Sequence, residues 1–240
     1  GKPRYIPDVE RTAAMDEFVT ELLANNAEHA DQFHTRFDDV QESQAPRAVT
    51  VCCSDSRVLQ DAMWTNTHPG RLFSCGNIGN RVIQRTGDGE AVSGDVLYPI
   101  AHTDTDTVVV VGHTGCGAVT AAYQALTTGS DESAGISHCL DLLTPSLADG
   151  VERLPDDLTR EAAINRLVEY NVDQQIEHLR ASKDVPTAVT IVGVVYDFQD
   201  RYSDRRGAVH VINIDGERDS STLREQHPEI ADRVTRLWNY

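Results

Sequence analysis

The sequence predicts an α/β fold: a single domain with a mainly parallel central β-sheet, one antiparallel edge strand, flanking helices and an N-terminal helical arm. Three runs rich in β-branched residues, at residues 48–53, 107–112 and 187–196, have the length and composition of buried strands. Segments with helical spacing separate these runs, as is typical of parallel sheets whose helices cross from strand to strand. A chain of 240 residues can bury one sizeable core, so we expect a single domain over residues 1–240.

The first predicted element is the arm, residues 1–45. Between residues 9 and 37, apolar side chains such as Met15, Phe18 and Leu22 recur near helical spacing, which predicts one or two amphipathic helices. This arm can pack on its own domain or lie across a second subunit, and the sequence favours neither arrangement.

The remaining elements follow in order along the chain. Periodicity and turn signals predict a short strand at 72–75, an edge strand at 208–214, and helices at 88–102, 117–126, 136–147 and 158–180. The Gly-rich stretch at 76–80 lacks the pattern of a nucleotide-binding loop. Residues 216–240 form an acidic C-terminal tail, which we expect to be helical from about residue 228.

The charge of the chain limits its partners. Lys and Arg number 21 and Asp and Glu number 38, which gives a formal net charge of −17. Such a surface repels phosphate groups, so we expect binding neither to nucleic acid nor to a membrane. Only Lys2 and Lys183 are lysines, and an acid excess with so little lysine favours a halophilic origin over that of an ordinary acidic protein.

The sequence also indicates a location. The first thirty residues are charged throughout and lack the apolar segment of a signal peptide. Five cysteines, an odd number, argue against a disulfide framework. We therefore expect a cytoplasmic protein that uses some of its cysteines for metal binding or catalysis.

Two strand ends carry side chains that bind metals. Cys53 ends the first predicted strand, and His113 and Cys116 follow the strand at 107–112. The carboxyl ends of neighbouring parallel strands meet in one crevice, so we expect these three side chains to converge. Two thiolates and one imidazole favour zinc, and three protein ligands leave the fourth position open, as in catalytic sites.

Two other interpretations of these cysteines remain open. Cys53 and Cys116 could be no more than small buried side chains, since free cysteine is among the most buried residue types. A closed structural zinc site would need a fourth ligand. Cys75 could supply it, whereas Cys52 points to the opposite face of its strand from Cys53.

Asp55 and Arg57 form a second candidate pair. They lie two residues apart in an extended turn, so they can project the same way, and a bidentate arginine keeps a carboxylate ionised and oriented. Beside a metal, such a carboxylate can accept a hydrogen bond from bound water and select the attacking lone pair. A plain surface ion pair would contribute only about 0–1 kcal/mol. Adjacency to Cys53 favours the catalytic interpretation.

Together these motifs resemble a known family. Cys-Ser-Asp-Ser-Arg at residues 53–57, followed by His-Thr-Gly-Cys-Gly at 113–117, is similar to the β-class carbonic anhydrases. The segments at 169–172 and 193–197 resemble the same family, and the likeness extends over residues 22–215. It implies a carbonate dehydratase, which hydrates carbon dioxide reversibly to bicarbonate and a proton.

The resemblance also implies roles for individual residues. One Zn²⁺ per subunit would be bound by Cys53, His113 and Cys116. Asp55 and Arg57 would be the catalytic dyad. Zinc lowers the pKa of its bound water toward ~7, and the resulting zinc-bound hydroxide attacks carbon dioxide. The family further implies a homodimer, or a tetramer built as a dimer of dimers, with its cleft at the subunit boundary.

Two alternatives to this activity remain at this point. The same scaffold could hydrolyse carbon disulfide or carbonyl sulfide, a change that would lie in the access route and the apolar lining. A zinc-binding regulatory protein without turnover is the other alternative. The intact Asp55–Arg57 pair speaks against it.

Two further residues are candidates for the substrate cleft. His68 stands where plant-like members of the family carry a glutamine that hydrogen-bonds substrate, so it could donate that bond or carry protons. Tyr98 matches a tyrosine of the cleft. The alternatives are an exposed turn histidine and a half-buried core tyrosine.

Overall fold

The chain consists of two compact units, Gly1–Gln44 and Ala45–Tyr240. The computed structural model describes residues 8–87 and 89–240. The expected arm therefore has its first seven residues outside the described part of the chain.

The first unit is helical, as the spacing of its apolar residues predicts. Helix α1 spans Asp8–Phe33, and the 3₁₀ helix η1 follows at His34–Phe37. Phe18, Leu22 and Leu23 are exposed to 58%, 51% and 66% on this helix. Large apolar side chains at this spacing form a stripe along a helix, so α1 carries an exposed apolar stripe.

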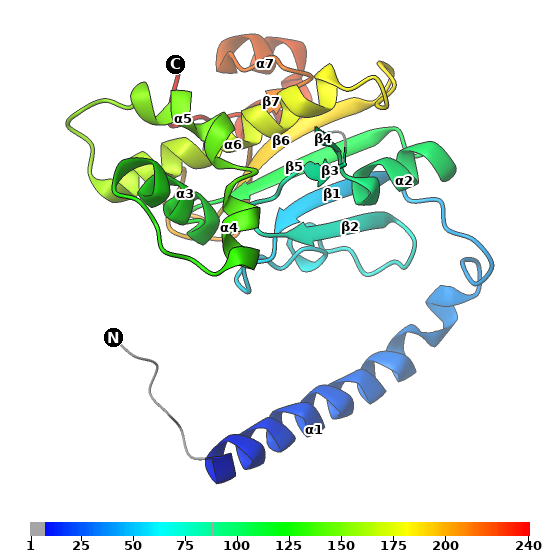
Figure 1. Cartoon of the computed structure of the whole chain (residues 1–240). Coiled ribbons are helices and arrows are strands. Elements are labelled where there is room, and N and C mark those ends of the chain that lie inside the picture. Colours follow the sequence, from blue (N-terminus) through cyan, green and yellow to red (C-terminus); the bar gives the residue numbers. More distant parts are fainter. Residues whose placement is uncertain (1–7, 88) are drawn as a thin grey trace. The chain divides into compact units, whose positions relative to one another are not determined.

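A five-stranded sheet organises the second unit, with the order β2-β1-β5-β6-β7 (Figure 1). The strands are β1 (Ala48–Cys53), β2 (Leu72–Asn77), β5 (Thr107–His113), β6 (Thr190–Asp197) and β7 (Ala208–Ile214). The first four are parallel, and β7 pairs with β6 in the antiparallel direction. The predicted fold class, a mainly parallel sheet with an antiparallel edge strand, is confirmed.

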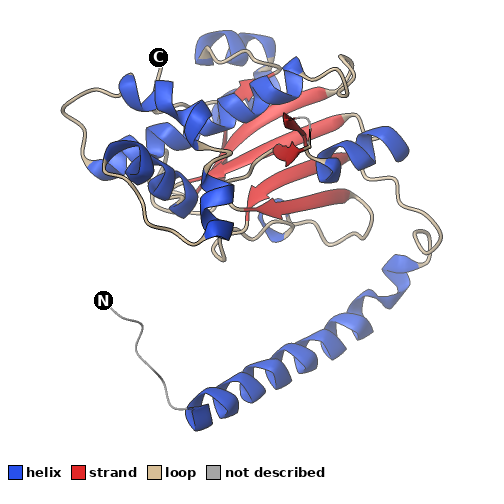
Figure 2. Ribbon diagram, viewed as in Figure 1, coloured by secondary structure: helices blue, strands red, loops and turns tan. Residues whose placement is uncertain are grey.

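Side chains alternate between two apolar clusters, one on each face of the sheet. Cys53 joins the cluster under the main helices, and Cys52 joins the cluster on the opposite face. Figure 2 shows helices packed over the first face. The helices contributing to that cluster are α2 (Gly94–His102), α3 (Gly117–Thr127), α4 (Ala134–Leu140), α5 (Thr144–Glu152) and α6 (Arg160–Ala181).

The segment expected to be one helix over 88–102 is a strand followed by a shorter helix. Strands β3 (Ile83–Thr86) and β4 (Gly89–Val92) form an antiparallel hairpin. The two residues between these strands in the sequence, 87 and 88, are a Gly-Asp pair, a hairpin turn signal that the helical expectation overlooked. Helix α2 begins only after Ser93, whose side chain accepts a hydrogen bond from the Asp95 backbone.

The helices after α3 are partly as predicted. The single helix expected over 136–147 is two helices, α4 and α5, because Pro145 suits the first turn of a new helix better than the middle of one. Helix α6, predicted over 158–180, buries an apolar stripe that includes Leu167, Val172 and Ile176. It lies close to the sheet at Gly112, where a Cβ atom would meet Val168 and Val172 at 2.9 and 2.7 Å.

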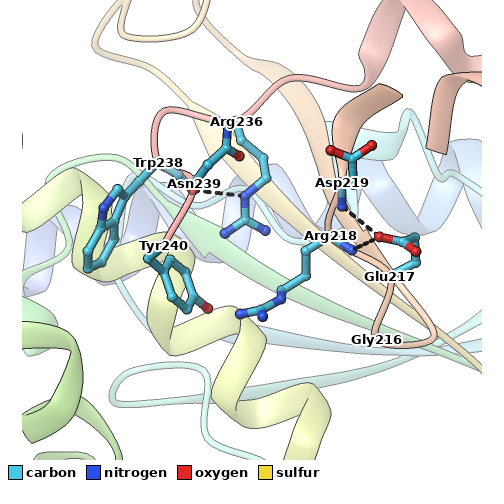
Figure 3. Close-up of a pocket in the computed structure, with 8 residues that line it drawn as sticks. All are labelled: Gly216, Glu217, Arg218, Asp219, Arg236, Trp238, Asn239 and Tyr240. Atoms are coloured by element: carbon cyan, nitrogen blue, oxygen red, sulfur yellow. Dashed lines mark hydrogen bonds between the residues drawn. The ribbon is translucent and has the colours of Figure 1, made fainter. Parts of the chain in front are cut away.

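The C-terminal tail, expected to be helical from about residue 228, has helical structure there and also earlier. It contains α7 (Ser220–Gln226) and a six-residue 3₁₀ helix, η3 (Pro228–Arg233). The residues after η3 return to α6, where the Arg236 guanidinium lies 2.7 Å from the Asp173 carboxylate. Figure 3 shows Arg236 and its neighbours lining a pocket of about 410 Å³. The tail is therefore part of the core, which its charge alone did not indicate.

No helix in the described residues is both long enough and apolar enough to cross a bilayer.

Candidate metal centre

The three predicted ligands come together at the carboxyl ends of two adjacent parallel strands. Cys53 ends β1, His113 ends β5, and Cys116 is the N-cap residue of α3. The Sγ atoms of Cys53 and Cys116 are 4.0 Å apart, and one ligand atom from each residue lies within 4.8 Å of the others. All three side chains are buried.

The imidazole of His113 is set up to bind a metal. Its Nδ1 lies 3.0 Å from the Thr114 carbonyl oxygen, so Nδ1 carries the proton and donates it, and Nε2 keeps its lone pair. Nε2 is buried and has no hydrogen-bond partner among the described residues. A tetrahedral zinc ion with Zn–S bonds of about 2.3 Å holds two sulfur atoms about 3.8 Å apart, close to the separation found here.

The two thiols favour the loss of one proton. A hydrogen bond from the Cys116 thiol lowers the pKa of Cys53 below its ordinary value, although burial opposes this shift. The same hydrogen bond, together with burial, raises the pKa of Cys116. Thiolates are the form of cysteine that binds metals, so the pair already favours a ligating state at Cys53.

The other two cysteines of these strands stand apart from the ligand group. Cys52 faces the opposite side of the sheet, and burial raises its pKa to about 12. The Cys75 thiol contacts the Asp95 carbonyl oxygen at 3.4 Å, and burial raises its pKa to about 11. The metal-binding group found among the described residues has three members and includes neither, so it does not form the closed four-ligand site.

Asp55 and Arg57 form a bidentate pair beside the ligands. The Arg57 Nε and Nη2 atoms donate to Asp55 Oδ1 and Oδ2 at 2.8 and 2.6 Å, and the Arg57 backbone N–H donates to Oδ1. These hydrogen bonds hold the pKa of Asp55 well below its usual range. Asp55 Oδ2 lies 3.9 Å from His113 Nε2, so an ionised carboxylate faces the metal-binding atoms.

Comparison with known sequences decides the family. The sequence model of the family described as carbonic anhydrase matches residues 48–202. The chain belongs to the carbonic anhydrase family. It is 30% identical over 200 residues to a carbonic anhydrase of Pseudomonas aeruginosa, covering 81% of this chain and 84% of that protein. It is also 30% identical over 190 residues to carbonic anhydrase 1 of Escherichia coli O157:H7, covering 77% and 84%.

Solved structures show the β-class fold. The β-carbonic anhydrase CcaA matches with a TM-score of 0.68 and 19% identity, over 84% of this chain and 88% of that one. A structure from Sordaria macrospora, described as one of two tetrameric β-carbonic anhydrases, matches with a TM-score of 0.66 and 22% identity, over 82% and 98%. The chain is therefore a carbonate dehydratase of the β-class, with a Cys53–His113–Cys116 group suited to its zinc cofactor.

Phe198 is a residue of this site that the sequence did not reveal. It follows β6 directly, and its ring stacks on His113 with centroids 5.6 Å apart. The Arg57 guanidinium carbon lies 4.7 Å from the centre of the same ring. Because β6 is the neighbour of β5 in the sheet, a residue just past its end was a candidate for the crevice on the same argument that located His113.

The loop that carries Phe198 is held by one carboxylate. Asp197 is fully buried and accepts hydrogen bonds from the backbone N–H groups of Gln199, Arg201 and Tyr202 at 3.0, 2.8 and 2.9 Å. These hydrogen bonds hold the pKa of Asp197 below its ordinary value, although burial opposes them. The loop is thereby fixed against the ligand side of the sheet.

The two cleft candidates, His68 and Tyr98, are exposed side chains, and their place in a cleft stays a prediction. His68 is an exposed loop residue whose backbone N–H donates to Asn66 Oδ1. Tyr98 is 51% exposed on α2, with its ring against Phe73 and His102. In the hydrogen bonds and ring contacts of the described residues, neither side chain reaches the three ligands.

Proposed function

We propose that Cys53, His113 and Cys116 bind one zinc ion per subunit and that Asp55 and Arg57 are the catalytic dyad. The observation that supports this most directly is the buried His113 Nε2 atom, which has no hydrogen-bond partner in the described part of the chain, on a residue that lies in one group with two thiols. A buried nitrogen without a partner is costly unless something binds it.

The dyad acts on the nucleophile. Zinc bound at this site supplies a Lewis acid that makes water acidic near neutral pH. Asp55 Oδ2 accepts a hydrogen bond from the attacking oxygen and so directs its free lone pair at the carbon of the substrate. Arg57 keeps Asp55 ionised and fixes both of its oxygens. A protein that only bound zinc would have no need of this pair.

The test compares the parent with His113→Ala. Zinc content is measured together with stopped-flow carbon dioxide hydration between pH 6.5 and 9. We expect one zinc per subunit and turnover that rises with pH in the parent, and loss of both in the variant. Full zinc content in His113→Ala would contradict the ligand assignment. Carbonyl sulfide and carbon disulfide, tested as substrates of the parent, would reveal the alternative hydrolase activity.

We further propose a homodimer or a dimer of dimers in which α1 packs on another copy of the chain. Two observations support it: the exposed apolar stripe on α1, and a groove of about 630 Å³ on the sheet face opposite the main helices. The groove is lined by valines, including Val109 and Val192, and edged by Arg205, Arg206 and Arg233. Its basic edge suits the acidic α1.

Sedimentation velocity tests this assembly. Leu22→Glu places a charge in the stripe and should shift the protein toward monomer. Ala24→Glu places the same charge on another side of the same helix and should leave the assembly intact. Equal behaviour of the two variants would argue against a role for the stripe.

We also propose a halophilic origin and a cytoplasmic location, both from the composition of the chain. An acid excess of 17 charges with only Lys2 and Lys183 as lysines supports a halophilic origin, and we expect the free energy of unfolding to rise between 0.2 and 2 M KCl. All five cysteines are free, which supports a reducing, cytoplasmic location. Unfolding that is insensitive to salt would contradict the first proposal.

A further inference from the structure

We propose that Asn165 is a positioning residue for the zinc ligand His113, acting through a single peptide group. This inference rests on the ligand assignment proposed above. Asn165 lies on α6, far from the ligands in sequence, and belongs to neither of the motifs that identify the site.

The connection runs through the peptide that joins Thr114 to Gly115. Its carbonyl oxygen, that of Thr114, accepts the hydrogen bond from His113 Nδ1 at 3.0 Å. Its N–H group, that of Gly115, donates to Asn165 Oδ1 at 2.9 Å. One peptide group is therefore bonded at both ends, to the imidazole on one side and to the amide on the other.

This arrangement sets both the direction and the strength of the His113 contact. A hydrogen bond accepted from a peptide N–H polarises the peptide, so its carbonyl becomes a better acceptor. A better acceptor at Nδ1–H makes Nε2 a stronger base and fixes the plane of the ring. Asn165 therefore acts on the metal-binding nitrogen without touching it.

The rest of the loop depends on the same peptide. Gly115 has a φ of +61°, a conformation that glycine adopts readily, and a Cβ atom there would lie 2.6 Å from the Gln199 side chain. Arg57 Nη2 lies 3.4 Å from the Gly115 carbonyl oxygen. The Gly115 carbonyl belongs to the next peptide, so a rotation of the Thr114–Gly115 peptide would act first on His113.

Asn165 itself is held rigidly. Its side chain is 2% exposed, and the neighbouring apolar residues of α6 are buried against the sheet. Its Nδ2 group has no partner among the described residues, so Gly115 is the one hydrogen-bond contact found for this amide. The hydrogen bond found for this side-chain amide is therefore made to the loop at Gly115 and not to α6 itself.

The experiment compares metal binding in three variants. Asn165→Leu removes the acceptor and excludes water, and Asn165→Asp keeps an acceptor at the same place. Asn213→Leu is the matched control, because Asn213 is equally buried and also accepts a glycine N–H, that of Gly216 at 2.8 Å. Zinc affinity is measured by chelator competition, and the absorption bands of the cobalt-substituted protein report the ligand geometry.

We expect Asn165→Leu to lower zinc affinity by about ten- to a hundredfold and to shift the cobalt bands. Asn165→Asp should bind zinc within a few-fold of the parent, and Asn213→Leu should lower the melting temperature without moving either readout. If Asn165→Leu does not fold, Asn165→Ala takes its place.

Parent-like affinity and parent-like cobalt bands in a folded Leu or Ala variant would overturn the proposal, because they would leave Asn165 a purely structural role. An Asn165→Asp variant that binds as weakly as Asn165→Leu would overturn it as well. Absence of thiolate–cobalt bands in the parent would instead refute the ligand assignment itself, so the two failures are distinguishable.

Discussion

Two buried polar clusters lie along α6, and they differ in whether all of their key polar atoms have hydrogen-bond partners within the protein. At Asn165 the helix meets the ligand group, where His113 Nε2 has no partner among the described residues. Farther along, Glu169 and Asp173 meet the C-terminal tail, where every carboxylate oxygen is bonded.

The tail cluster is closed by many donors. Glu169 accepts from the Tyr202 hydroxyl and from the backbone N–H groups of Leu237 and Trp238, at 2.7, 2.7 and 3.0 Å. Asp173 accepts four hydrogen bonds: two from the Arg236 guanidinium, one from the Asn213 side-chain amide and one from the Tyr240 hydroxyl. Within the described chain, each carboxylate oxygen of this cluster therefore already has a hydrogen-bond donor.

The difference shows how burial can be used in two ways. A closed polar cluster holds two parts of the fold together, and its loss is a loss of stability. An open cluster keeps an atom ready for a ligand, and its loss is a loss of chemistry. Variants of the two clusters should therefore separate activity from stability.

The largest effect on activity is expected from Asp55→Asn in the open cluster. An amide cannot accept from the nucleophile as a carboxylate does, so kcat should fall by about 10²- to 10⁴-fold while zinc stays bound. Stopped-flow rates and zinc content check this. Asp200→Asn, which breaks the exposed Asp200–Arg206 pair, should leave kcat unchanged. Full activity in Asp55→Asn would remove the dyad from the mechanism.

The largest effect on stability is expected from Arg236→Met in the closed cluster. It leaves Asp173 and Glu169 buried without their cation and should lower the free energy of unfolding by about 3–5 kcal/mol. Urea unfolding measures this, with the exposed Arg85→Met as control. Turnover per folded molecule should not change. A proportional loss of kcat in Arg236→Met would erase the distinction between the clusters.

A smaller effect is expected at Phe198, between His113 and Arg57. Phe198→Leu removes the cation–π contact with the half-exposed Arg57, which contributes about 0.5–1 kcal/mol. If that energy is lost from the transition state, kcat should fall about two- to fivefold. Phe198→Tyr keeps the ring and should stay near the parent. Phe33→Leu, which removes the similar contact with Arg36, should have no effect on kcat. A Tyr variant as slow as the Leu variant would argue against the ring contact.

The smallest effect expected is on the pH dependence of the free energy of unfolding, through His210. This buried side chain belongs to neither of the two clusters. Neither ring nitrogen of His210 has a partner within the described chain, and burial lowers its pKa, with Asp197 opposing and Arg233 assisting. A lowered folded-state pKa means that the unfolded chain binds the proton more readily. Stability from this group is therefore full above its ordinary pKa of about 6.5 and is lost as the pH falls below it.

His210→Phe should remove this dependence, because phenylalanine can also stack on Tyr202 and takes up no proton. Urea unfolding at pH 5, 6, 7 and 8 should show a smaller loss of stability toward low pH than in the parent. His178, whose pKa burial also lowers, still titrates in the variant. An unchanged slope would assign the whole pH dependence to other groups.

The sequence was sufficient for the residues whose chemistry is local to a strand end. Cys53, His113 and Cys116 were predicted to converge because parallel strands share their carboxyl ends, and they do. The Asp55–Arg57 pair was predicted from a spacing of two residues, which is a local property as well.

The parts that were missed depend on distant contacts. Asn165 meets Gly115 across 50 residues, and Arg236 meets Asp173 across 63. No local sequence pattern predicts either pairing. In the sequence, Asn165 and Asp173 are ordinary polar residues of a helix, and Arg236 is an ordinary residue of a charged tail. The β3–β4 hairpin was missed for another reason, since a turn signal was present and the helical reading outweighed it.

The separation of Asp173 from Arg236 also sets an order of events during synthesis. The three side chains of the metal-binding group all lie within residues 53–116, so the ribosome makes them early. Helix α6 follows, and it cannot dock with its two carboxylates neutralised until residue 236 has emerged. Both thiols of the group are therefore synthesised well before Arg236, the residue that completes the cluster between α6 and the tail.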